Sequence, residues 1–274
     1  MRQIPLLLSL LSLLSSLYLL GLVTTPALAA ITTVRVPLLA EQIEGRYFYM
    51  DVAQAALARM PGNPELELVG PIPQARAQSM LAAGTLDLMW MIESADRDEL
   101  YLTTGVGLTN GLIGQRVLMI RPQDQTLFAG VESLQDFRAL GLTAGFGPGW
   151  IDSRVWAAND LDFHIEQGNW QVMFDKLKRG RTDYDYLSRS IKEVQLELAA
   201  HPELVLEDQL LLRYDKDEVF YVSPHNPDLQ HAFVQALQAM AADGALSRLV
   251  DLHFGQVMTD LQVDQRTLIE LDNP

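Results

Sequence analysis

The chain has 274 residues with 35 acidic and 20 basic side chains, so its formal net charge is -15 at pH 7. This excess of negative charge argues against nucleic acid or an anionic membrane surface as a partner. The sequence contains no cysteine, which excludes disulfides, lipid attachment through cysteine and cysteine metal ligands. A chain of this length can bury a hydrophobic core without such cross-links.

Residues 1–29 are predicted to be an export leader that is cleaved off. An apolar run over 4–23 is followed by helix-breaking residues up to Pro26 and by Ala27-Leu28-Ala29, which fits a small-x-small cleavage site. The apolar run is long enough to span a bilayer, so an uncleaved anchor is the alternative. The proline and the cleavage motif favour removal, and we expect the mature protein in the periplasm.

Strand and helix patterns alternate along the first part of the mature chain. Apolar spacing predicts strands over 33–39, 65–69 and 86–92, with helices over 46–60 and 74–83 between them. This order is typical of a parallel sheet. The first helix begins with three adjacent aromatic residues, 47–49, and at least one of them must face away from the core because neighbouring helical residues do not share a face.

A second unit is predicted after a strand over 116–121 and a polar break that begins at Pro122. Its patterns are helix 131–140, strand 141–146, a turn over 147–150, helices 152–158 and 170–179, strand 183–187 and helix 190–200. An acidic break near Asp217 precedes strand 219–222, a helix that begins at Pro227 and a last helix over 246–254. The sequence therefore predicts an α/β protein with two units.

The first unit carries candidate ligand residues where its strands end. Open α/β sheets bind ligands at the carboxyl ends of their strands. Ser94 and Arg97 follow strand 86–92, and the planar guanidinium of Arg97 suits a carboxylate or a phosphate. The alternative is a surface arginine paired with nearby acids of its own helix. The other candidates in this unit are Trp90, Gln74 and Glu41.

The second unit offers the turn Gly147-Pro148-Gly149-Trp150. The backbone N–H groups of Gly149 and Trp150 could point at an anion, and Asp152 opens the helix that follows. The alternatives are an ordinary strand-to-helix turn and a helix-capping role for Asp152. Further along, Arg189 and Glu193 are spaced to pair with each other on a helix.

Sequence motifs for catalysis or metal binding are not found. The histidines are far apart, and the chain has no HExxH, GxSxG or GxxxxGK[ST] pattern. We therefore predict no catalytic residues, no metal site and no cofactor.

The order of several segments resembles bacterial periplasmic solute-binding proteins of type 2, nearest the polar-amino-acid-binding branch. The resemblance covers about 33–255. It rests on GTLDLMWMIESADRDEL, GLIGQRVLMI, ESLQDFRALGLTAGFGPGW, LKRGRTDYDY and EVFYVSPHNPDLQHAFVQALQAMAADGALSRLVDLHFG, in that order.

The resemblance implies a two-lobed α/β fold whose hinge consists of two crossing strands. Lobe 1 would be 31–121 plus 219–274, and lobe 2 would be 122–218. It further implies that Arg97 binds a ligand carboxylate with Ser94 beside it, that Gly149 and Trp150 donate from lobe 2, and that Gln74 occupies a position often held by an aromatic residue.

Two departures from the family pattern bear on the solute. Ser188 stands where an acid usually binds the ligand ammonium, and Asp185 could replace that acid only if the register slips. Pro148-Gly149 replaces the usual hydroxyl residue of lobe 2. These departures argue against an ordinary L-amino acid, whereas a carboxylate-bearing or aromatic ligand remains compatible.

The leading hypothesis is a monomeric periplasmic protein that captures a small polar solute, with a carboxylate, for an inner-membrane permease or receptor. The first alternative is an enzyme on the same fold, similar to cyclohexadienyl dehydratase, in which Glu41, Glu93 or Asp152 would act as acid or base. The second alternative is a scaffolding module without a ligand.

Overall fold

The computed structural model describes residues 31–40, 46–180 and 183–273. The predicted leader lies outside these residues. Two groups of elements surround separate hydrophobic clusters, and the first group comes from both ends of the described chain. Its elements are β1 (Thr33–Leu39), α1 (Arg46–Leu57), β2 (Glu65–Ile72), α2 (Gln74–Ala82), β3 (Leu88–Ile92), α3 (Ala95–Asp98), β4 (Leu102–Thr103), β11 (Glu218–Val222), α8 (Pro227–Ala242) and α9 (Ala245–Asp260).

The predicted parallel pairing is found between β1 and β2. Val34 and Val36 of β1 point into the core because alternate strand residues face opposite sides. Arg35, on the other side, binds the carboxylate of Asp87 at 2.8 Å, and the backbone N–H of Asp87 donates to the Arg35 carbonyl. These contacts attach β1 to the start of β3.

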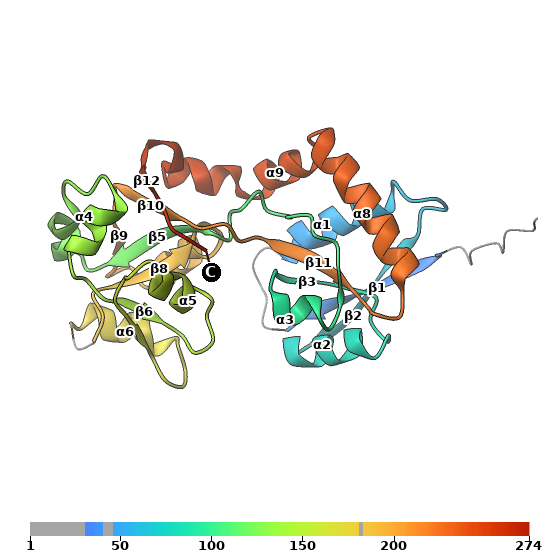
Figure 1. Cartoon of the computed structure of the whole chain (residues 1–274), viewed down its shortest axis with the longest axis horizontal. Coiled ribbons are helices and arrows are strands. Elements are labelled where there is room, and N and C mark those ends of the chain that lie inside the picture. The colour runs from blue at the N-terminus through green and yellow to red at the C-terminus, as the bar shows by residue number, and fades with distance from the viewer. Residues whose placement is uncertain (1–30, 41–45, 181–182, 274) are drawn as a thin grey trace, which may run out of the picture. The chain divides into compact units, whose positions relative to one another are not determined.

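Strand β3 is almost fully buried, and its partner comes from much later in the chain. It pairs antiparallel with β11, with Trp90 opposite Phe220 and Ile92 opposite Glu218. Helices α1, α8 and α9 cover one side of these strands, and α2 and α3 lie on the other (Figure 1). Within α1, Tyr47 is 71% exposed while Phe48 and Tyr49 are buried, which confirms that the three aromatic residues divide between surface and core.

The second group contains a seven-stranded mixed sheet whose two faces are both covered. On β5, Leu118 and Ile120 point into one hydrophobic cluster, and Val117 and Met119 point into the other. The elements of this group are β5 (Gln115–Ile120), η1 (Pro122–Phe128), α4 (Leu134–Ala139), β6 (Ala144–Phe146), α5 (Asp152–Ala158), β7 (Phe163–Ile165), α6 (Val172–Lys178), β8 (Tyr186–Ser190), α7 (Ile191–Ala200), β9 (Val205–Leu206), β10 (Leu210–Arg213), η2 (Val263–Gln265) and β12 (Thr267–Glu270).

The sheet pairing differs from the sequence-based lobe ranges at two strands. β5 lies in the range expected for lobe 1, yet it pairs with β8 and β10 of the second sheet. β12 also lies in that range and pairs parallel with β10. The chain therefore passes between the two groups three times: before β5, after β10 and through α9, which packs on the first core at Val250 and ends beside the second at Leu261.

None of the helices in the described ranges is both long enough and apolar enough to cross a bilayer.

Candidate functional site

The carboxyl end of β3 and the short helix α3 bring Ser94 and Arg97 together with a tyrosine from β11. The Ser94 N–H donates to the Tyr221 hydroxyl at 3.3 Å, and that hydroxyl donates to Asp98 at 2.8 Å. Burial raises the pKa of the Tyr221 phenol, which therefore remains protonated. The corner is thus a local hydrogen-bonded unit held to the sheet.

Arg97 is half-buried, and its guanidinium donates to the backbone carbonyl of Ile92. Of the acids beside it, Asp96, Asp98 and Glu99, none forms an ion pair with Arg97 in the described structure, and Asp98 accepts from the Tyr221 hydroxyl. A guanidinium has five N–H donors, so the contact with one carbonyl leaves capacity for an oxyanion. This placement is compatible with the expected anion-binding role of Arg97.

Trp90 is part of the core rather than an exposed aromatic surface. Its side chain is 3% exposed and its ring stacks on Tyr49, with centroids 4.8 Å apart and planes inclined by 6°. The stacking holds Tyr49 in place at the end of β3. The buried Trp90 ring therefore packs under Tyr49 and is not exposed for the ligand contact expected from the sequence.

Tyr49 belongs to a buried polar cluster with Glu218 and Lys192 that the sequence did not indicate. Its hydroxyl donates to Glu218 at the start of β11, and Lys192 of α7 donates to the same hydroxyl. The Lys192 ammonium also lies 2.6 Å from Glu218 Oε2. Burial raises the pKa of the Glu218 carboxyl to about 8, while the adjacent Lys192 ammonium opposes that rise. Residues 49, 192 and 218 are remote in sequence, so no local pattern could connect them.

In the second group, the expected turn is present and Gly149 is exposed with φ +75°. Trp150 is half-buried beside a cation: the Arg189 guanidinium lies 4.6 Å from its ring and 5.4 Å from the Trp170 ring. Arg189 is also bound to Glu197, and to Glu193 at 3.0 Å, which confirms the pairing expected from their spacing. The Trp150 ring thus packs against the Arg189 guanidinium, which is itself paired with Glu193 and Glu197.

Asp152 does not present its carboxylate to solvent. It is 4% exposed, its Oδ1 lies 2.9 Å from Arg116 Nε, and it accepts from the Tyr214 hydroxyl at 3.0 Å. Burial also raises the pKa of the Tyr214 phenol. The expected ligand role of Asp152 is replaced by an internal ion pair, because Arg116 of β5 approaches the start of α5 from the sheet.

The remaining expected residues are dispersed. Gln74 is exposed at the first position of α2. Glu41 lies outside the described residues. Ser188, at the position usually held by an acid, is 1% exposed, and its Oγ lacks a hydrogen-bond partner in the part of the chain described.

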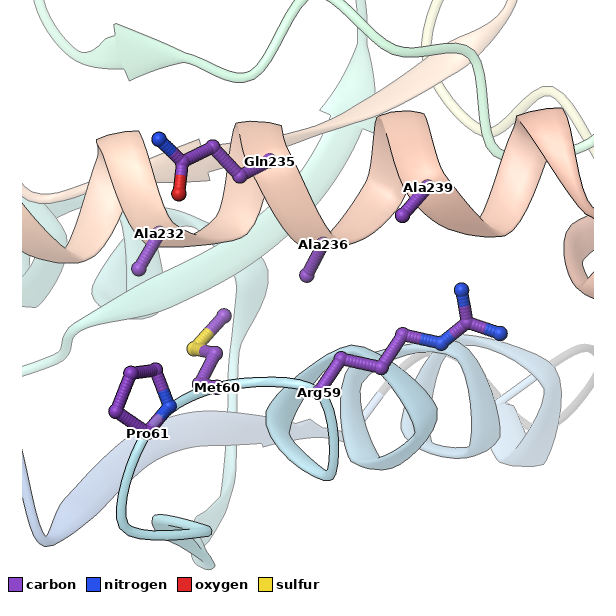
Figure 2. A pocket seen from close by; sticks show the side chains of 7 residues that line it. All are labelled: Arg59, Met60, Pro61, Ala232, Gln235, Ala236 and Ala239. Atoms are coloured by element: carbon purple, nitrogen blue, oxygen red, sulfur yellow. The ribbon is translucent and has the colours of Figure 1, made fainter.

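Two pockets of the described structure lie elsewhere. A cavity of about 130 Å³ lies between the end of α1 and α8, where Met60 and Pro61 face Ala232 and Ala236 (Figure 2). A larger polar pocket of about 430 Å³ is lined by residues before β5 and at the ends of β10 and β12, including Arg213. Neither is lined by the described candidate ligand residues. Among the described residues, no group of three His, Cys, Asp or Glu is placed to hold a metal ion.

No protein-family model matches the chain. A search of curated proteins gave no match either. Solved structures do match. An amino-acid ABC transporter substrate-binding protein, AbpA from Streptococcus pneumoniae bound to L-arginine, is 16% identical with a TM-score of 0.54, covering 82% of this chain and 95% of that one.

The chain has the two-lobed type 2 periplasmic-binding-protein fold. An ancestral arginine-binding protein bound to arginine is 17% identical with a TM-score of 0.52, covering 81% of this chain and 98% of that one. A structure described for glutathione import via GshT of Streptococcus mutans is 14% identical with a TM-score of 0.53, covering 82% and 96%. At these identities the likeness establishes the fold.

Proposed function

We propose that this chain is an exported solute-binding protein for a small polar solute that carries a carboxylate. The observation that carries the proposal is the position of Arg97, a half-buried guanidinium at the carboxyl end of β3 that its neighbouring acid Asp98 does not neutralise. Ligands of open α/β sheets bind at such strand ends.

In this proposal Arg97 forms a charge-assisted hydrogen bond to the solute carboxylate, and Ser94 offers a hydroxyl beside it. The Gly149 N–H is the proposed backbone donor of the second group, since the Trp150 N–H expected beside it donates to the Gly147 carbonyl at 3.4 Å. Gln74 contributes an amide at the start of α2. Glu41 remains a candidate of the loop after β1. The lobes correspond to the two hydrophobic groups, with β5 and β12 belonging to the second.

The proposed class of solute depends on which acidic side chains of this chain are accessible at the expected ligand positions. The matched solved structures include proteins bound to arginine and to glutamine. In this chain, Asp152 is committed to Arg116, and Ser188 is neutral and buried. Since these positions offer no accessible acid, we propose a solute recognised through its carboxylate rather than through an ammonium group.

We further propose that the protein acts in the periplasm as a monomer, after removal of its leader, and delivers the solute to an inner-membrane permease or receptor. The match to ABC transporter substrate-binding proteins supports a permease. The proposed role is binding without turnover. Of the three carboxylates named as an acid or base, Asp152 is buried against Arg116, Glu93 is half-buried and Glu41 lies outside the described residues, so an assay of turnover under saturating ligand separates the two roles.

The test is native mass spectrometry of the protein from the periplasm, followed by thermal unfolding with a panel of mono- and dicarboxylates. A ligand at 100 times its Kd should stabilise the fold by about 2.7 kcal/mol. Arg97→Ala should abolish this stabilisation, while Arg248→Ala, an exposed arginine on α9, should retain it. Absence of any co-purified solute and of stabilisation by every carboxylate would contradict the proposal.

A further inference from the structure

Three polar groups meet where α7 approaches α1 and β11. The Lys192 ammonium donates to Glu218 at 2.6 Å and to the Tyr49 hydroxyl, which itself donates to Glu218. The ammonium also lies 5.1 Å from the Tyr49 ring centroid, within the range of a cation–π contact. We call Tyr49, Lys192 and Glu218 the junction triad.

The triad joins elements that belong to different hydrophobic groups. Tyr49 lies in α1 and is buried in the first core. Lys192 lies in α7, whose apolar residues Ile191 and Val194 are buried in the core of the second sheet. Glu218 begins β11, immediately after the chain returns from that sheet. The triad is therefore a side-chain connection between the two groups, in addition to the covalent ones.

The adjacent residue, Asp217, fastens two of the crossing segments to each other. Its carboxylate accepts from the backbone N–H groups of Thr109 and Gly111 at 3.1 and 2.9 Å. An added Cβ at Gly107 would lie 2.6 Å from Asp217 Oδ2, so the segments approach closely there. Glu218 is consequently held at a defined position, and its contact with Lys192 determines where α7 can lie.

The contacts of the junction triad are costly to break because its side chains are buried. The side chains of Lys192 and Glu218 are 8% and 13% exposed, and Tyr49 is fully buried against Trp90. Removing one partner of a buried pair leaves the other unpaired, which is strongly unfavourable. Any movement of α7 away from α1 and β11 must break the contacts of Lys192 with Glu218 and with Tyr49, whereas the Tyr49–Glu218 hydrogen bond lies within the first group.

We propose that the junction triad is a latch that holds the second group of elements against the first, and that its opening frees the two groups to move relative to each other. The latch acts in the solute-free chain, so the inference does not depend on the proposed solute. In this proposal, the junction triad, which lies outside the corner with Ser94 and Arg97, limits the relative movement of the two groups.

The test is a distance measurement between spin labels in the full chain without added solute. The sequence has no cysteine, so Gln54→Cys on α1 and Gln171→Cys before α6, both exposed, would be the only labelled positions. In this background, Lys192→Met should shift and broaden the distance distribution. Lys176→Met is the matched control, because Lys176 pairs with Glu166 inside the second group at 2.7 Å.

A folded Lys192→Met protein whose distance distribution equals that of the unmodified pair would overturn the proposal. If Lys192→Met does not fold, Lys192→Gln keeps a polar side chain but removes the ammonium that contacts Glu218 and Tyr49, and it is measured in the same way. Its distribution should broaden as well, and an unchanged distribution there would equally reject the latch.

Discussion

Asp152 Oδ1 lies 2.9 Å from Arg116 Nε, and both side chains are less than a tenth exposed. The Tyr214 hydroxyl accepts from Arg116 at 2.6 Å and donates to Asp152 at 3.0 Å, so the pair is closed by a third group. The pair connects β5 to the start of α5 and to the residue after β10. The pair buries Asp152, which the sequence analysis expected to contact the ligand.

We expect Asp152→Asn to destabilise the fold by about 3–5 kcal/mol, because the Arg116 guanidinium would stay buried without a counter-charge. Arg116→Met combined with Asp152→Leu should cost less than Asp152→Asn alone, since both charges are removed. Chemical denaturation of the three proteins measures this. Equal stability of Asp152→Asn and the unmodified protein would disprove the structural role.

Glu218 should make stability depend on pH. Its pKa is raised from 4.5 to about 8 by burial, so the folded chain binds a proton more tightly than the unfolded chain. The contribution is fully present below pH 4.5 and is lost as the pH rises through 8. The slope for one group is at most about 1.4 kcal/mol per pH unit.

Glu218→Gln should flatten this slope relative to the unmodified protein when the free energy of unfolding is measured from pH 5 to 8. The comparison isolates Glu218 because the other titrating groups are shared. A difference between the two slopes of the opposite sign would mean that the contact with Lys192 outweighs the burial of the carboxyl.

Gly114 lies at a crossing where no side chain fits. An added Cβ would lie 1.9 Å from the backbone oxygen of Tyr214. We expect Gly114→Ala to destabilise the fold by about 1–3 kcal/mol, the usual cost of overpacking. Gly255→Ala is the control, because its Cβ would meet Asp251 at an ordinary 3.9 Å and alanine favours the α9 helix. Thermal unfolding of both variants distinguishes them, and equal stabilities would argue against the close approach.

Arg97→Lys should weaken carboxylate binding by roughly tenfold, about 1.4 kcal/mol, because an ammonium cannot form the bidentate contact of a guanidinium. The measurement is titration calorimetry with the carboxylate that stabilises the unmodified protein. Unchanged affinity would mean that the solute does not contact Arg97.

Several features could be predicted from local sequence because they depend on neighbours along the chain. Strand β3, the polar corner with Ser94 and Arg97, the turn at Gly149 and the Arg189–Glu193 pair all follow from short-range spacing. The alternating order of strands and helices indicated an α/β fold, and the ordered segments indicated the type 2 fold that the solved structures match.

Other features were decided by packing between distant segments. β5 and β12 joined the second sheet because β8 and β10 provided their hydrogen-bonding partners. Arg116 reached Asp152 only through that sheet, and Lys192 met Glu218 only where α7 approaches β11. Sequence determined the local elements and their apolar faces. Tertiary structure decided which charges are buried together, because the free energy of a buried charge depends on a partner that the chain brings from far away.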